Sequence, residues 1–222
     1  FQIWMARTNE PYTELFGTLE SVLSTFQFIE PMDTSGWQTY RDEKLGIELQ
    51  YPQGWKADKQ STTGRQGHIY SSIYYNPNEN EGDPYMSDQG DGYIFISLFP
   101  NISKSLDEWY KSIASFTDER INKSIEFMNL EVGEGFVSRS DIKVENSIMM
   151  KISGYPAIAE YRSSLKPLNI EGGPMTEKIY YVKVGDNGYQ ISVSTPTGDQ
   201  ADEMIALFDR IISSIQFKEN RF

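Results

Sequence analysis

A tight turn between two apolar runs sets the strongest limit on the fold of this chain. Gly185-Asp186-Asn187-Gly188 separates the runs 178–184 and 189–194, which are rich in β-branched and aromatic residues. Asn-Gly is typical of two-residue turns between antiparallel strands, because such turns favour positive φ angles. We therefore expect a β-hairpin, with Asn187 and Gly188 at positive φ, and an antiparallel sheet built around it.

Other segments have the alternation or the apolar content of strands. Residues 46–51 alternate apolar and polar, which predicts a half-buried strand. Residues 93–99 are almost continuously apolar, which predicts a central strand covered on both faces. Further strands are expected at 68–75, 147–152, 157–162 and 216–218.

Two segments have the apolar spacing of amphipathic helices, namely 105–117 and 202–214. Ser105 and Glu108 have the spacing of a capping box at the start of the first helix. Residues 118–146 show no clear period, and we expect irregular structure there with one or two strands. Together these segments predict an α+β fold, in which helices pack on about five to seven antiparallel strands.

The first thirty residues resemble the last thirty. Residues 1–6 align with 189–194 and, after a gap of one residue, 14–30 align with 203–219, with seven identical positions. Composition alone would give about two identities over that length. Each copy reads as a strand, an amphipathic helix and a second strand. A unit of this size cannot bury its own apolar face.

We interpret residues 1–30 as the tail of an upstream repeat, 31–36 as a linker and 37–222 as the main domain. The unit 1–30 is then expected to dock on the main domain or on another copy of the chain. The start at Phe1 is expected for a processed protein or for a piece of a longer one. A tandem or lipid-anchored parent protein is consistent with this interpretation.

Composition limits the partners and the compartment. The net charge of −12 argues against nucleic acid and anionic membrane surfaces as partners. No run approaches the roughly 18–20 consecutive apolar residues of a transmembrane helix. The chain has no cysteine, which excludes disulfides, thiolate metal sites and cysteine nucleophiles. Together with 14 tyrosines, the absence of cysteine favours an extracytoplasmic protein, secreted or anchored at the cell surface.

The sequence offers little for catalysis. His68 is the only histidine and lies in a predicted strand, without a nucleophile at a recognisable spacing. No nucleophile elbow, phosphate-binding glycine loop or zinc spacing is present. We therefore predict that the chain is not an enzyme and holds no cofactor, with calcium as the one exception to consider.

A polar loop over 76–91 is the candidate calcium site. Its carboxylate and amide oxygens are the hard ligands that calcium prefers, and the candidates are Asn78, Glu79, Glu81 and Asp83. An EF-hand loop that began at Asn76 would need glycine where Glu81 stands and glutamate where Ser87 stands. A solvated acidic loop is therefore the competing interpretation.

Aromatic residues suggest a second kind of ligand site. Trp37 and Trp55 together with Tyr70, Tyr74 and Tyr75 could form a platform on which sugar rings stack. The competing interpretation is that these side chains fill the core between sheet and helices. The region 68–91 thus predicts, at most, a module that binds carbohydrate or calcium.

Three stretches of the main domain resemble the PsbP-like family, whose namesake is an extrinsic subunit of photosystem II. They are the strand and turn that end in Tyr51-Pro52-Gln53-Gly54-Trp55, the stretch from Gly154-Tyr155-Pro156 to Arg162, and the end of the chain from Tyr180 to Phe217. The resemblance covers about residues 37–219. These motifs mark strands and turns and carry no catalytic residues.

The resemblance implies an α–β–α sandwich on a largely antiparallel sheet. It implies no reaction, because the prokaryotic relatives are typically secreted or lipid-anchored proteins without an assigned activity. The photosystem subunit acts by binding other proteins, but its binding residues match no motif of this chain. We therefore expect a non-enzymatic module that binds a protein partner or another copy of itself, with carbohydrate or calcium binding as the alternative.

Overall fold

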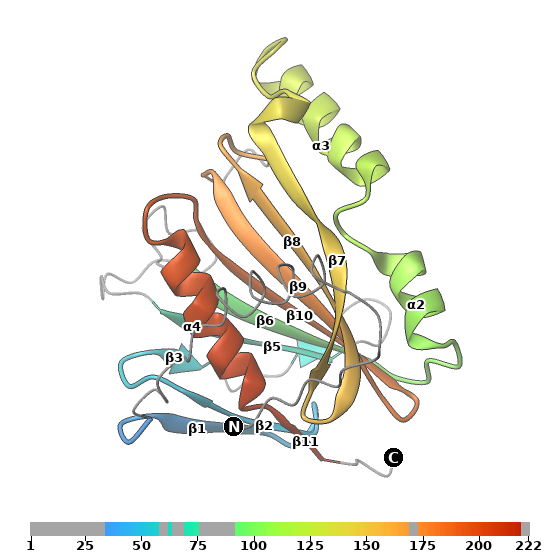
Figure 1. Cartoon of the computed structure of the whole chain (residues 1–222), viewed down its shortest axis with the longest axis vertical. Coiled ribbons are helices and arrows are strands. Elements are labelled where there is room, and N and C mark those ends of the chain that lie inside the picture. The colour runs from blue at the N-terminus through green and yellow to red at the C-terminus, as the bar shows by residue number, and fades with distance from the viewer. Residues whose placement is uncertain (1–33, 58–61, 64–68, 76–91, 169–172, 219–222) are drawn as a thin grey trace, which may run out of the picture. The chain divides into compact units, whose positions relative to one another are not determined.

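The computed structural model describes residues 34–57, 62–63, 69–75, 92–168 and 173–218 (Figure 1). The chain divides between Ser35 and Gly36 into two units. Only Thr34 and Ser35 of the first unit are described, so the predicted repeat at 1–30 lies outside the described residues and stays a prediction. The second unit has the predicted mixed α+β architecture.

An eight-stranded sheet forms the centre of this unit, and all its pairings are antiparallel. The order of its strands is β3-β5-β6-β10-β9-β8-β7, and β4 pairs with β5 beside this path. The bounds are β3 Lys56–Ala57, β4 Thr62–Thr63, β5 Ile69–Tyr75, β6 Gly92–Phe99, β7 Ile142–Ile152, β8 Tyr155–Ser164, β9 Met175–Val184 and β10 Asn187–Pro196. The sheet has one strand more than the largest number expected from the sequence.

Strand β6 occupies the inner position predicted for it, between β5 and β10. Ile94, Ile96 and Leu98 on one face of the strand are at most 1% exposed. The residues that alternate with them on the other face are only partly buried. The prediction of a strand covered on both faces is therefore fully met on one face and partly on the other.

A second, three-stranded sheet joins the two ends of the domain. Its order is β1-β2-β11, with bounds Gln38–Asp42, Ile47–Tyr51 and Gln216–Phe217. Ile47 lies opposite Phe217, and the Lys218 amide donates to the Gly46 carbonyl at 2.7 Å. The small sheet therefore depends on residues from both ends of the domain.

Three α-helices are described, α2 Leu106–Ile113, α3 Asp118–Glu131 and α4 Ala201–Ser213, with a short 3₁₀ helix at Arg139–Asp141. The predicted capping box is confirmed, because Ser105 Oγ accepts from the Glu108 amide while the Glu108 carboxylate accepts from the Ser105 amide. The helix α4 matches its predicted segment closely. The helix α2 ends at Ile113, four residues before the predicted end at 117, because the backbone of Ala114 is no longer helical.

The helix α3 corrects the expectation of irregular structure over 118–146. Thr117 caps its start by accepting a hydrogen bond from the Arg120 amide at 3.3 Å. Ile121 and Met128 are spaced by two turns and are each 1% exposed. Phe127 and Leu130 lie elsewhere on the helix surface and are exposed. These outer apolar residues obscure the helical period, which is why the sequence pattern missed it.

The helices cover both faces of the large sheet, which confirms the predicted α–β–α sandwich. Adjacent residues of β9 point to opposite faces, and two tyrosines show the division. The Tyr180 hydroxyl donates to Asp209 of α4, whereas the Tyr181 ring packs edge-on against Trp109 of α2, with centroids 6.1 Å apart. Figure 1 shows α4 on one side of the sheet, with α2 and α3 beyond the other.

The β9–β10 hairpin is present, but its turn lies two residues before the predicted one. Asn187 is paired with Val184, so Gly185 and Asp186 form the turn, and only Gly185 has positive φ, at 58°. Glycine at the first central position is the signature of a type II′ turn. Gly188 belongs to the strand instead, where a Cβ atom would lie 2.6 Å from the Trp109 ring. This glycine therefore makes room for an indole.

Candidate functional site

The described residues contain few groupings that could act in catalysis or metal binding. No group of three or more histidine, aspartate or glutamate residues that could hold a metal occurs in the part of the chain that the structure describes. Within the same residues, no helix is long and apolar enough to cross a membrane. The predicted calcium ligands Asn78, Glu79, Glu81 and Asp83 lie outside the described residues, and calcium binding there stays a prediction.

Glu160 of β8 is the centre of a buried polar network on the α2 side of the sheet. Its side chain is almost fully buried, with the residue 5% exposed. It accepts hydrogen bonds from the Tyr110 hydroxyl at 2.9 Å, the Tyr181 hydroxyl at 2.8 Å and the Ser115 amide at 3.1 Å. Desolvation raises the pKa of both tyrosines, with the Glu160 charge adding to it. These tyrosines therefore stay protonated, and they hold the corner between α2 and α3 on the sheet.

Asp209 forms a comparable network on the other face. Lys178 Nζ lies 2.8 Å from both carboxylate oxygens of Asp209, and the Tyr180 hydroxyl also donates to this carboxylate. Burial is the main reason that the pKa of Tyr180 is raised, and the nearby Asp209 charge adds to it. The aspartate thus ties α4 to β9. Like the Glu160 network, it has a structural role that the observed bonds account for.

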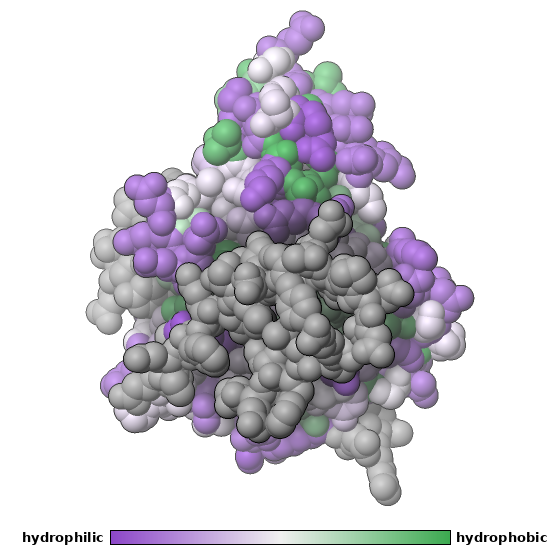
Figure 2. All heavy atoms as spheres, in the orientation of Figure 1, coloured by the Kyte–Doolittle hydropathy of each residue, from purple (hydrophilic) through white to green (hydrophobic). Residues whose placement is uncertain are grey.

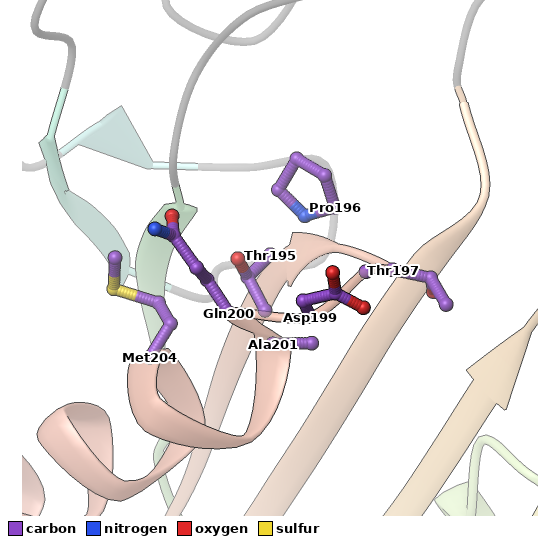
Figure 3. Close-up of a pocket in the computed structure, with 8 residues that line it drawn as sticks. Thr195, Pro196, Thr197, Asp199, Gln200, Ala201 and Met204 are labelled. Carbon is purple, nitrogen blue, oxygen red and sulfur yellow. The ribbon is translucent and has the colours of Figure 1, made fainter.

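A hollow of about 380 Å³ lies where β10 leads into α4 (Figure 3). Its lining is Thr195, Pro196, Thr197, Gly198, Asp199, Gln200, Ala201 and Met204. The hydroxyl of Thr197 is already within 3.1 Å of the Thr176 hydroxyl. The lining contains one carboxylate, Asp199, together with the hydroxyls of Thr195 and Thr197, and no histidine or lysine.

A second hollow, of about 330 Å³, lies at the other end of α4. Its polar groups are also engaged in holding the fold together. Ser214 Oγ accepts from the Gln50 amide at 2.9 Å, and the Ser153 hydroxyl donates to the Ile215 carbonyl. This hollow therefore marks the junction between α4, the small sheet and the β7–β8 turn.

The predicted aromatic platform is not assembled around Trp55. This indole is 7% exposed and packs edge-on against Phe208 of α4, with centroids 5.7 Å apart. It is part of the core and offers no free face for a sugar ring. Tyr70, Tyr74 and Tyr75 lie in β5, and a ligand site at these three residues stays a prediction.

The free edge of β7 is the most distinctive exposed feature of the sheet. Among the described strands β7 pairs with β8 alone, and at eleven residues it is the longest of them. Seven of its residues are exposed, and on the side away from β8 no strand of the described residues pairs with it. The apolar side chains of Ile148 and Met149 are 54% and 70% exposed in the middle of this strand.

Apolar side chains are also exposed at the end of the domain that carries α3. Phe127, Leu130 and Val132 belong to the second half of α3 and its C-cap, and Leu130 is 83% exposed. Figure 2 shows hydrophobic residues among the hydrophilic ones at this end of the molecule.

The sequence predicted a strand at 147–152 but could not show that it lies at an edge. Its run Ile148-Met149-Met150 was the only available signal.

Comparisons with known proteins bear on the fold. No protein-family model and no curated protein matches the sequence. Cyanobacterial PsbP (CyanoP) from Synechocystis has a similar structure, with a TM-score of 0.50 and 16% identity, over 87% of this chain and 99% of that one.

Two further similar structures have lower TM-scores. LpqN of Mycobacterium tuberculosis, a protein involved in cell envelope biogenesis, has a TM-score of 0.48 and 12% identity, over 78% of this chain and 83% of its own. The Ran-binding protein Mog1p of Saccharomyces cerevisiae has 0.43 and 10%, over 82% and 95%. The similarity to CyanoP shows that the domain has the fold of PsbP, as the resemblance of its sequence implied. At an identity of 16% the likeness concerns the fold alone.

Proposed function

We propose that this chain is a non-enzymatic protein-interaction module that works outside the cytoplasm, within a larger or lipid-anchored protein. The observation that carries the proposal is the free edge of β7, with exposed apolar side chains on a strand that, within the described part of the chain, has a neighbour on one side only. The module binds a protein partner by adding a strand of that partner to the sheet.

The physical basis is the row of unpaired N–H and C=O groups along an edge strand. An extended segment of another protein satisfies these groups by forming one more antiparallel or parallel ladder. The side chains at Ile148 and Met149, which point to opposite faces of the strand, then cover the added segment from both sides. Backbone bonds supply affinity in this mode, and the flanking side chains supply selectivity.

Other observations support the same proposal. The resemblance to PsbP-like proteins implies a function through partner proteins, and the carboxylates of Glu160 and Asp209 have structural hydrogen bonds. The absence of cysteine and the tyrosine-rich composition favour the extracytoplasmic location. None of these carries the proposal without the edge of β7.

Site-specific photo-crosslinking in cells that make the full-length protein would test the proposal. A photoreactive amino acid at position 149 lies on the free edge, and one at the exposed Glu203 of α4 is the matched control. We expect a crosslinked protein from position 149 and none from position 203. Adding Ile148→Lys to the position-149 protein should abolish that product, because a charge on an edge strand opposes strand pairing.

Equal crosslinking from both positions would overturn the proposal, as would crosslinking at position 149 that survives Ile148→Lys. Ile148 is more than half exposed, so this substitution should change the free energy of unfolding by no more than about 0.5 kcal/mol. A thermal melt of each variant checks that a lost crosslink reflects lost binding.

A further inference from the structure

We propose that a second copy of this chain occupies the free edge of β7, with the two β7 strands antiparallel and centred on Met150. This inference rests on the proposed function, because it names the partner of the same edge. It is carried by the division of β7 into two unlike halves and by the self-complementary sequence of the second half.

A β-bulge separates the two halves. The register of β7 against β8 shifts between Glu145 and Ile148, which leaves an extra residue on β7. Lys143 and Glu145 lie before the bulge, and their side chains form an ion pair with 2.8 Å between Nζ and Oε1. Charges and bulges are the usual protection of an edge strand against unwanted pairing, so the first half of β7 is protected.

The second half, Ile148–Ile152, lacks most of this protection. Its five residues pair regularly with Tyr155–Ala159 of β8. Lys151 is its single charged residue, and the other four are isoleucine or methionine. Regular pairing leaves the backbone groups of the free side in the spacing that a further strand needs.

An antiparallel copy fits this half in one register. With Met150 opposite Met150 of the second copy, Ile148 lies opposite Ile152 and Met149 lies opposite Lys151. No lysine then faces a lysine, so the pairing avoids the like-charge repulsion that destabilises directly opposed residues. A shift to either side brings the bulge or the turn at Ser153 and Gly154 into the ladder, and that turn has positive φ at both residues.

The same register continues the hydrophobic core. Ile152 is 2% exposed and belongs to the large cluster under α4, and Met150 packs against this cluster. Ile148 lies on the same face, because it is paired with Ala159 of that cluster. The two copies would therefore form one continuous row of apolar side chains that joins the large cluster of one copy to that of the other. The row consists of Ile148, Met150 and Ile152 from each copy. Five residue pairs make a small contact, which predicts a transient dimer.

The absence of cysteine makes a direct test possible, since every introduced thiol is unique. Directly opposite Cβ atoms of an antiparallel pair lie about 4.5–5.5 Å apart, close to the roughly 3.5–4.5 Å of a disulfide. We expect Met150→Cys in the full chain to form a disulfide-linked dimer under mild oxidation. Lys143→Cys, before the bulge, is the matched control and should stay monomeric over the same time.

A mixture gives the sharper result. Met149→Cys and Lys151→Cys should each crosslink poorly alone. In this register position 149 of one copy lies directly opposite position 151 of the other copy, so two identical thiols lie diagonally from each other, about 7–8 Å apart. Mixed together, the two variants should crosslink at least tenfold faster than either alone. A parallel arrangement or another register would not give this pattern.

Three outcomes decide the inference. Crosslinking of Met150→Cys no faster than that of Lys143→Cys overturns it, as does a purely monomeric full chain in sedimentation at several hundred micromolar. If photo-crosslinking from position 149 still yields a different protein, the proposed function stands and only the identity of the partner is wrong. The predicted cysteine pattern, together with a dimer that Ile148→Lys abolishes, supports the inference.

Discussion

The two faces of the large sheet are covered in different ways. Under α4, 24 described side chains form one buried cluster that continues into the small sheet, whereas the cluster under α2 and α3 has eight. The smaller cluster is supplemented by the Glu160 network, which bonds to the corner between the two helices. One face is thus held mainly by apolar burial and the other by fewer apolar contacts with localised polar bonds.

The α2 face can change locally without unfolding of the domain, whereas the α4 face cannot. Loss of a side chain from the large cluster affects both sheets, because residues of β2, β6, β10 and α4 share it. Loss of a bond at Glu160 affects the attachment of α2 and α3 and leaves the larger cluster intact. We therefore expect substitutions on the α4 face to lower the stability of the whole domain, and substitutions on the α2 face to act locally.

The largest effect is expected from Phe208→Ala in α4. Phe208 is fully buried and packs against Trp55, so its truncation leaves a cavity between α4 and the sheet. We expect a loss of about 3–5 kcal/mol in the free energy of unfolding, measured by urea denaturation. Glu203→Ala, on the exposed side of the same helix, should change it by less than about 0.5 kcal/mol. A small loss from Phe208→Ala would mean that the α4 face is less cooperative than its burial indicates.

A smaller and local effect is expected from Glu160→Gln. The amide group of glutamine places a donor where the carboxylate accepted from Tyr110, Tyr181 and Ser115. We expect a loss of about 2–3 kcal/mol, with faster hydrogen exchange at the amides of α2 and α3. The amides of α4 should exchange no faster than the loss in the global free energy of unfolding accounts for. Uniformly faster exchange would contradict the separation of the two faces.

Gly188→Ala should cost about 2 kcal/mol through overpacking against Trp109. The ideal Cβ position lies 2.6 Å from the indole, and this glycine has no positive φ angle to lose. The same substitution in a Trp109→Leu background should therefore cost much less, which a double-mutant cycle measures. Equal costs in the two backgrounds would show that the backbone of the strand, and not the ring, requires glycine.

The smallest effect concerns Tyr189, whose hydroxyl donates to the Leu45 carbonyl at 2.8 Å on the α4 face. Burial raises the pKa of Tyr189 to about 12, whereas an unfolded tyrosine has a pKa of about 10. Its contribution to stability is therefore complete below pH 10 and is lost as the pH rises from 10 to 12, because the unfolded state releases the proton first.

Tyr189→Phe tests this linkage. At pH 8 the variant should be about 1 kcal/mol less stable, because the Leu45 carbonyl loses its donor. Between pH 10 and 12 its stability should fall less steeply than that of the parent chain. Tyr181→Phe is the counterpart on the other face, where burial also raises the pKa of the tyrosine. Parallel pH profiles for parent and Tyr189→Phe would show that this hydroxyl does not carry the alkaline loss.

Much of the fold could be predicted from local patterns. The apolar run of β6, the hairpin of β9 and β10 and the capping box of α2 each follow from neighbouring residues. The position of the hairpin turn could not, because Gly185-Asp186 and Asn187-Gly188 are both acceptable turn sequences. Packing decides between them, since only the observed register places Gly188 beneath the Trp109 ring.

The candidate site was harder to predict than the fold. A strand around Ile148 was expected, but its place at the edge of the sheet depends on strand order, which is a property of the whole domain. Trp55 was predicted to be part of a site but lies in the core. The sequence could not show this, because aromatic residues that bind sugars and aromatic residues that fill cores have the same local pattern. Only the position of Phe208, far away in the sequence, shows that this indole is covered.

The small sheet has a consequence for how the chain reaches this structure. Its strand β2 has β1 nearby in sequence but needs β11 as its other neighbour, and Lys218 and Glu48, which form an ion pair across it, are 170 residues apart. Contacts between such distant residues close a long loop, and they slow folding because its entropy is lost before the contact stabilises the chain. Because β11 is the last of the described strands in the chain, we expect the large sheet to assemble before β11 pairs with β2 and completes the small sheet.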